Sequence, residues 1–293
     1  MKGKRRRNPR GVIYLILAIL VFLLPVVLTQ YKNWEQHRIA EEYSRSVFDL
    51  TPEKREQAFA EAQDYNAHLP EVGAPDPWVN GVDTKSPDYQ HYLQVLRQVG
   101  PMARVHVPSV GIDLPVYHGT STDVLAHGVG HLYGTALPVG GEGNHAVLTG
   151  HTGLATLTMF DNLTHIKVGD VFTVEVMGKT MAYKVDQIET VLPDQVEALR
   201  AEEGRDLLTL VTCTPYGINS HRLLVRGERT ELPAELDQSY HSLWQPWMIA
   251  AIIIVLFVLL YLLWWFLAGR KLSLIHISEP TRLRQLSRMP SSA

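Results

Sequence analysis

Two long apolar runs lie near the two ends of the 293-residue chain, and neither contains a charged residue. They cover residues 12–29 and 247–268. A helix rises 1.5 Å per residue and must cross about 30 Å of hydrocarbon, so both lengths predict membrane-spanning helices. The alternative for the first run is a secretory signal. However, the run is longer than a signal requires and no small-x-small cleavage site follows it, which favours an uncleaved anchor.

Basic residues flank the outer sides of both runs, within residues 1–11 and 269–293. Because Lys and Arg concentrate on the cytoplasmic side of membrane helices, we expect both termini in the cytoplasm and the residues between the runs outside the cell. Residues 30–246 carry 16 Lys and Arg against 29 Asp and Glu, a formal charge of −13. This acidic charge argues against nucleic acid as a binding partner. The cell membrane is an expected partner, and we expect the chain to contact it through the two apolar runs only.

The amino-acid composition of the residues between the runs changes twice along the chain. Residues 30–70 are charged and alanine-rich, which predicts two helices forming a stalk, and residues 71–84 read as a loop. Residues 85–232 begin with a short helix and then hold seven short β-rich runs separated by turn residues. That pattern predicts a mainly β domain, an antiparallel barrel or sandwich. Residues 233–246 are expected to link it to the second run.

The amino-acid sequence of the C-terminal segment is unusual. LSLIHISEPTR, at the start of residues 272–293, matches one reading frame of a widely used sequencing-library adapter. We therefore expect this segment to derive from the adapter rather than from the natural protein, with a short basic cytoplasmic tail as the alternative.

The only cysteine of the chain, Cys213, closes an apolar strand candidate, and Arg222 opens the next one. Pro215, Gly217 and Asn219 lie between them and favour a tight reversal. If the two strands form an antiparallel hairpin, the thiol and the guanidinium face each other. A thiolate that attacks a carbonyl beside a fixed cation suits acyl transfer. Taken singly, a buried inert thiol and a surface ion pair remain the alternatives.

The third group that acyl transfer needs is a proton donor for the leaving amine, for which histidine is suited. His151 ends the β-rich run HAVLTGH, so we expect it at a strand end as well. His127 and His131 are four residues apart, as two metal ligands on a helix would be, but the glycines around them disfavour that helix and no further ligand completes a set. No metal or cofactor is expected.

Three separated segments resemble the signatures of one protein family, in the same order along the chain. They are GVGHLYGTALPVGG, LTGHTGLATLTMFDNL and TLVTCTPYGINSHRLLVRG. The sequence resembles the sortases, extracellular cysteine transpeptidases of Gram-positive bacteria, and specifically the pilin-polymerising class C. The second apolar run agrees with class C, which has a C-terminal membrane span.

The resemblance implies an eight-stranded barrel in which His151, Cys213 and Arg222 form the catalytic triad. As our own hypothesis, we expect Thr212 or Thr214 to assist Arg222 in binding the substrate. A lid with an Asp-Pro-aromatic motif precedes the barrel in class C, and Asp76, Pro77 and Trp78 match that motif. The indole would cover the thiol, and the carboxylate would neutralise the guanidinium until substrate displaces it.

The expected activity is cleavage of an LPXTG-like sorting signal between Thr and Gly, with transfer of the acyl group to a lysine of the next pilin subunit. Pilin subunits are therefore the expected partners. Three alternatives stay open: a housekeeping sortase that attaches proteins to peptidoglycan, a hydrolytic cysteine peptidase, and a membrane-tethered adhesin without enzyme activity.

Overall fold

The computed structural model describes residues 9–69, 83–154, 156–195, 197–234 and 244–275. The chain divides into two compact units. One unit is Pro25–Leu243, which contains the β domain, and the other comprises Met1–Leu24 and Trp244–Ala293.

Both predicted membrane spans are helical. The first lies in helix α1 (Pro9–Phe48) and the second in helix α5 (Pro246–Ile275). By length and composition both helices can cross a membrane. Helix α1 also continues without interruption into the charged segment, with Pro25 inside it, so the first span and the first helix of the expected stalk are one element.

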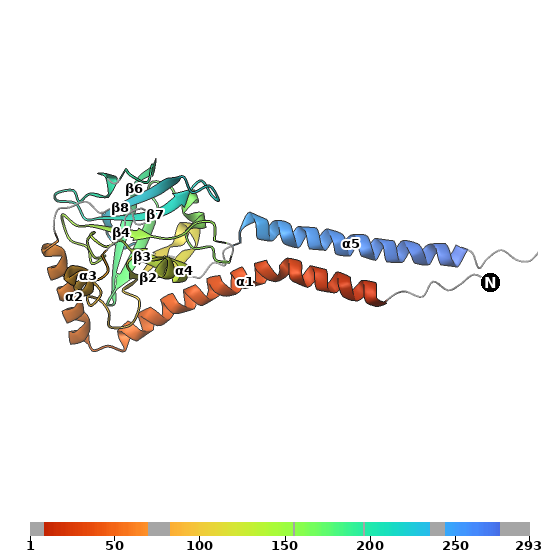
Figure 1. Cartoon of the computed structure of the whole chain (residues 1–293), viewed down its shortest axis with the longest axis horizontal. Helices are drawn as coiled ribbons and strands as arrows, with labels where there is room; N and C mark the ends of the chain where they lie inside the picture. Colours follow the sequence, from red (N-terminus) through yellow and green to blue (C-terminus); the bar gives the residue numbers. More distant parts are fainter. Residues whose placement is uncertain (1–8, 70–82, 155, 196, 235–243, 276–293) are drawn as a thin grey trace, which may run out of the picture. The chain divides into compact units, whose positions relative to one another are not determined.

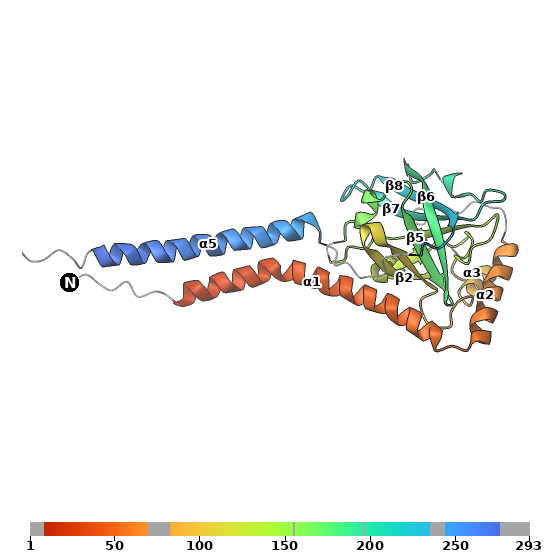
Figure 2. The ribbon, with the colours of Figure 1, turned by 180° about the vertical axis from the view of Figure 1, so that it is seen from behind.

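Within the described residues, eight strands close into one barrel in the order β1-β2-β3-β4-β7-β8-β6-β5 (Figure 1). Strand β5 closes the barrel by pairing with β1, and both β5 and β6 are labelled in the view from behind (Figure 2). The strands are β1 (Ala103–Val107), β2 (Ile112–His118), β3 (Val129–His131), β4 (His145–Thr149), β5 (Val171–Val176), β6 (Lys179–Val191), β7 (Leu207–Thr214) and β8 (His221–Thr230).

The barrel agrees with the predicted mainly β class, and two details differ from the pattern-based prediction. Strand β3 was not among the seven runs, because three residues are too short to show a period of two. The pairs β2–β3 and β4–β7 are parallel, whereas the pattern predicted antiparallel strands throughout. Strands β5 and β6 form an antiparallel hairpin, and its turn consists of Met177 and Gly178, both with positive φ.

The remaining elements are short. They are α2 (Pro52–Ala67), α3 (Pro87–Tyr92), α4 (Thr122–His127) and the 3-10 turns η1 (Pro108–Val110), η2 (Asp161–His165) and η3 (Glu197–Leu199). Thr51 and Ser86 cap α2 and α3 by accepting a backbone N–H, each with a proline at the start of the helix. The short helix expected at the start of residues 85–232 is therefore confirmed as α3.

Helix α2 and the second half of α1 do not form a separate stalk, because both contribute to the core of the barrel. Tyr43 and Val47 of α1 and Phe59 of α2 are buried in the same cluster as the barrel interior. The Tyr43 hydroxyl donates to the Met102 carbonyl (3.0 Å) and accepts from the Met177 amide (3.1 Å). The prediction missed this packing because the few apolar positions are spaced among many charged ones.

A buried ion pair fixes α1 to strands β1 and β2. Arg104 donates two hydrogen bonds of 2.7 Å to the carboxylate of Asp113, and the imidazole of His37 on α1 lies 2.6 Å from the same carboxylate. Burial disfavours the charge, but the bonds from Arg104 and His37 outweigh it and lower the pKa of Asp113 to about 2.

We expect Asp113→Asn to lower the free energy of unfolding by about 3 kcal/mol at pH 7, because it leaves Arg104 without its counter-charge. The folded pKa of Asp113 lies below the unfolded value, so its contribution, about 2 kcal/mol, is present above pH 4 and is lost as the pH falls toward 2. The difference in thermal unfolding between wild type and variant, measured in detergent, must therefore shrink on acidification. Asp123→Asn, an exposed change, is the control; a pH-independent difference contradicts the pairing.

Candidate active site

The β7–β8 hairpin places Cys213 and Arg222 opposite each other. They are direct partners in the antiparallel register. The turn between the strands begins with a cis peptide bond from Thr214 to Pro215, and Gly217 and Asn219 adopt positive φ values of 76° and 59°. The hairpin and its facing pair, predicted from the turn residues, are therefore confirmed as geometry.

Cys213 and Arg222 lie on the face of the sheet that points away from the barrel interior. Side chains alternate along a strand, so Cys213 shares a face with Val211, and Arg222 shares one with Leu224. Val211 and Leu224 belong to a small apolar cluster separate from the interior core. Cys213 and Arg222 are each 8% exposed, so both side chains are largely removed from water.

The turn itself orients the guanidinium of Arg222. Its Nη1 donates to the backbone carbonyls of Asn219 and His221, each at 3.3 Å. On its other side Arg222 pairs in register with Val191, the last residue of β6. A hydrocarbon side chain there limits water at the cation and strengthens its electrostatic interactions.

His151 reaches the same level from the other side of β7. Strands β4 and β7 are parallel, with Thr149 opposite Val211, and the Gly150 amide donates to the Val211 carbonyl (3.0 Å). Two residues further along, that register brings His151 level with Cys213. Counted by these registers, the backbone positions of His151, Cys213 and Arg222 form one row across three adjacent chain segments.

Burial sets the protonation of the imidazole. His151 is half-buried, and desolvation lowers its pKa from the ordinary value. The neutral form is therefore favoured at neutral pH, which suits a group that must accept a proton from a thiol and then deliver it to a leaving group.

The two threonines beside the cysteine differ in their surroundings. Thr212 is fully buried and points to the barrel interior, where its hydroxyl donates to the Gly150 carbonyl (2.8 Å) and pairs with the Thr152 hydroxyl (2.8 Å). It therefore holds the start of the loop that carries His151. Thr214 is half-buried at the end of β7. Their part in substrate binding stays a prediction, and the position of Thr212 favours a supporting role.

The loop between β6 and β7 packs on the same outer face, which the sequence did not indicate. Its Leu199 joins the apolar cluster of Val211 and Leu224. The His145 imidazole on β4 donates from Nδ1 to the Arg200 carbonyl (2.8 Å) and accepts at Nε2 from the Thr209 hydroxyl (2.7 Å). Through Leu199, this loop packs on the face of the sheet that also carries Cys213 and Arg222.

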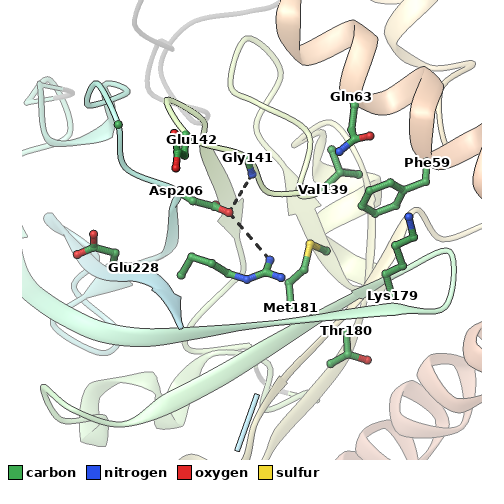
Figure 3. A pocket seen from close by; sticks show the side chains of 12 residues that line it. Phe59, Gln63, Val139, Gly141, Glu142, Lys179, Thr180, Met181, Asp206 and Glu228 are labelled. Carbon is green, nitrogen blue, oxygen red and sulfur yellow. Dashed lines mark hydrogen bonds and ion pairs between the residues drawn. The ribbon is translucent and has the colours of Figure 1, made fainter. Parts of the chain in front are cut away.

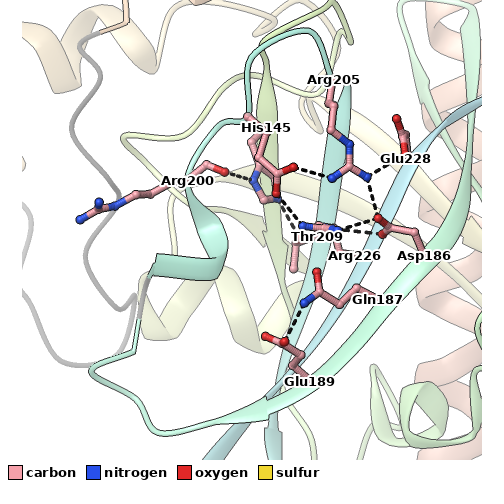
Figure 4. Close-up of polar contacts among 10 residues, drawn as sticks. His145, Asp186, Gln187, Glu189, Arg200, Arg205, Thr209, Arg226 and Glu228 are labelled. Atoms are coloured by element: carbon pink, nitrogen blue, oxygen red, sulfur yellow. Dashed lines mark hydrogen bonds and ion pairs between the residues drawn. The ribbon is translucent and has the colours of Figure 1, made fainter.

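A charged network holds the base of this loop (Figure 4). Arg226 of β8 donates twice to Asp186 of β6, at 3.1 and 2.6 Å, and to Glu202 of the loop at 2.7 Å. Arg205 connects Glu202, Asp186 and Glu228. Networks of several charges in a partly buried place hold geometry better than single surface pairs.

A cavity of about 560 Å³ lies at the opposite end of the barrel. Figure 3 shows Phe59 and Gln63 of α2, Lys179 of β6 and Asp206 around it. Asp206 directly precedes β7 and accepts from the Gly141 amide (2.8 Å). Asp206 and Cys213 are seven positions apart along extended chain, roughly 20 Å, so this cavity is not part of the row of His151, Cys213 and Arg222.

The lid residues Asp76, Pro77 and Trp78 lie outside the described residues. Within the part of the chain that is described, no cluster of His, Cys, Asp or Glu could hold a metal. His131 is fully buried and bonded through its two ring nitrogens to the Tyr92 hydroxyl (2.9 Å) and the Ala136 carbonyl (2.8 Å), and His127 is exposed.

Comparison with known proteins identifies the family. A model of the sortase domain matches residues 105–230. Sortase C-1 from Actinomyces oris is 50% identical, and the match covers 61% of this chain and 99% of that chain with a TM-score of 0.59. Sortase C of Streptococcus pneumoniae, whose structure is described as bearing on catalysis and pilin substrate specificity, is 38% identical over 68% and 100% (TM-score 0.61). A lid mutant of sortase A from Corynebacterium diphtheriae is 44% identical over 63% and 97% (TM-score 0.59).

We expect the imidazole of His151 to titrate below the ordinary value of about 6.5, because burial penalises its charged form. Histidine-labelled full-length protein in detergent micelles, followed by NMR from pH 4 to 8, measures this. The resonance of His151 is the one that disappears in His151→Gln. A midpoint at or above 6.5 contradicts the expected environment.

Proposed function

This chain belongs to the sortase family of cysteine transpeptidases, with class C sortases among its structural relatives, and we propose that it polymerises pilin subunits. The observation that carries the proposal is the in-register pair of Cys213 and Arg222, with His151 level with Cys213 on the neighbouring chain segment. Two apolar helices support membrane association. We propose that both termini are cytoplasmic and that the barrel is extracellular.

In the first half-reaction, the Cys213 thiol transfers its proton to His151 and the sulfur attacks the threonine carbonyl carbon of an LPXTG-like sorting signal. A C–S bond forms and the carbonyl oxygen becomes an oxyanion. Arg222 stabilises that charge, and such a donor contributes about 3 kcal/mol in comparable sites. As the oxyanion collapses, the bond to the glycine nitrogen breaks and His151 returns the proton to the leaving amine. A thioester remains.

In the second half-reaction, the ε-amine of a pilin lysine attacks the thioester carbonyl. The isopeptide C–N bond forms and His151 accepts the proton of that amine. The C–S bond then breaks, and the proton on His151 passes to the sulfur, which restores the thiol and the neutral imidazole. The apolar cluster around Val211 and Leu224 favours an amine over water, because it limits solvent beside the sulfur. Repetition of the cycle links subunits covalently.

We further propose that Asp76, Pro77 and Trp78 form a lid over the thiol. The description of the Corynebacterium relative as a lid mutant agrees with this, as does the match to the Asp-Pro-aromatic motif. The indole would exclude water, and Asp76 would neutralise Arg222 in the resting enzyme.

Full-length protein in micelles, mixed with a pilin domain that ends in a sorting signal, should form covalent dimers and longer products. Mass spectrometry should find a Thr–Lys isopeptide and free C-terminal peptide. Cys213→Ala should reduce both products to the level without enzyme, because no thioester can form. Hydrolysed pilin alone would favour a peptidase, and transfer to oligoglycine but not to pilin lysine would favour a wall-anchoring sortase.

The double change Asp76→Ala and Trp78→Ala should increase the rate at which iodoacetamide alkylates Cys213 by about tenfold, because the thiol becomes open to solvent. The rate is followed by mass spectrometry of the single cysteine. Trp34→Ala on α1, which removes an exposed indole from a described part of the chain, is the control. An unchanged alkylation rate would mean that the segment only packs on the barrel.

A further inference from the structure

The loop that carries His151 spans residues 150–161, of which the structure describes all but residue 155. The Phe160 amide donates to the His151 carbonyl (3.1 Å), which closes the loop behind the imidazole. The Gly153 amide donates to the Asp161 carboxylate (2.7 Å), and burial raises the pKa of that carboxyl to about 6. The Phe160 ring packs so closely on Gly150 that a Cβ there would lie 2.8 Å from it. Moving one end of this loop therefore moves the backbone of His151.

Hydrogen bonds attach the loop to its surroundings on two sides. On the β7 side, the Thr212 hydroxyl binds the Gly150 carbonyl and the Thr152 hydroxyl. On the far side, Asn33 of α1 donates from Nδ2 to the Thr158 hydroxyl (2.8 Å) and accepts at Oδ1 from the Thr158 amide (3.0 Å). The loop is thus held between the nucleophile strand and the N-terminal helix.

The pair of Asn33 and Thr158 is built into the interior. Asn33 is 5% exposed and Thr158 is 1% exposed, although 125 residues separate them in sequence. A buried amide is costly unless both its oxygen and its nitrogen are bonded, and here both are. Two directional bonds fix the position of the Thr158 backbone more tightly than apolar packing alone.

We propose that Asn33 is a positioning residue for the transfer reaction: through Thr158 and the Phe160–His151 hydrogen bond, it holds the imidazole at the level of Cys213. This inference rests on the proposed function for its kinetic consequences and on the hydrogen-bond geometry for its structural ones. The same helix that contains the first apolar run thereby becomes part of the catalytic machinery.

The chain offers a matched control on the next helix. Asn66 of α2 is 7% exposed, and its amide also makes two hydrogen bonds to a loop. It donates to the Leu137 carbonyl (3.0 Å) and accepts from the Leu137 amide (2.7 Å). Its loop carries none of the proposed catalytic groups. Removing either amide should cost similar stability, so a difference in activity isolates positioning from folding.

The test compares Asn33→Ala with Asn66→Ala in full-length protein in micelles, at a temperature where both are folded by circular dichroism. We expect Asn33→Ala to lower kcat for a fluorogenic sorting peptide at least tenfold while KM changes less than twofold, because misplacing a proton-transfer group slows chemistry without weakening peptide binding. Asn66→Ala should retain kcat within threefold. Equal losses in the two variants would overturn the proposal.

A second variant and a second measurement allow the proposal to be tested even if Asn33→Ala does not fold or no peptide is cleaved. Thr158→Val keeps the shape of the side chain but removes the acceptor of Asn33 Nδ2, so it should show a smaller loss in kcat and carries the test if Asn33→Ala does not fold. By NMR, the pKa of His151 should rise toward the ordinary imidazole value in Asn33→Ala, because water enters behind the loop, and should stay unchanged in Asn66→Ala. An unchanged pKa of His151 in Asn33→Ala would refute the positioning role, even if no peptide were cleaved. A wild-type protein in which His151 titrates as expected but which cleaves no peptide would refute the proposed function alone.

Discussion

The register of β7 against its two neighbours is the constraint on which the site depends. Parallel pairing with β4 sets the level of His151, and antiparallel pairing with β8 sets Arg222 opposite Cys213. Because side chains alternate, a slip of one residue would turn Cys213 into the barrel interior and bring Thr212 to the outer face. The interior bonds of Thr212 to Gly150 and Thr152 oppose that slip, so the residue beside the nucleophile secures the register that presents it.

The surroundings of this row decide what its groups can do. Val211, Leu224 and Leu199 supply an apolar surface next to Cys213, where a cation stabilises a developing oxyanion more strongly than it would in water. Burial of His151 itself lowers the pKa of its imidazole, which favours the neutral form. The charged network of Arg205 and Arg226 holds the loop between β6 and β7 at a distance from Cys213. It therefore adds rigidity without placing carboxylates beside the thiol.

The parts of this architecture that arise locally could be predicted from sequence. Turn residues and strand ends were enough for the Cys213–Arg222 hairpin, and apolar length was enough for the two membrane-spanning candidates. Long-range choices could not be predicted: β3 is too short for a periodic signal, and the parallel partner of β4 depends on tertiary packing. Asn33 was also missed, because a polar residue in a charged helix carries no sign of burial against a loop 125 residues away.

Hydrogen bonds are a physically suitable way to hold the loop of His151. The loop has glycines at positions 150 and 153 and must carry a half-buried imidazole, so it has limited apolar surface of its own near the row. Thr212 and Asn33 compensate from opposite sides with short bonds to backbone atoms, and each of these side chains is fixed by its own element, a central strand and a long helix. Strand register thus sets the position of Cys213, whereas the loop of His151 is also bonded to a helix outside the barrel. If Asn33 positions His151 as proposed, a change in α1 can alter the transfer reaction while all three residues of the proposed triad stay the same.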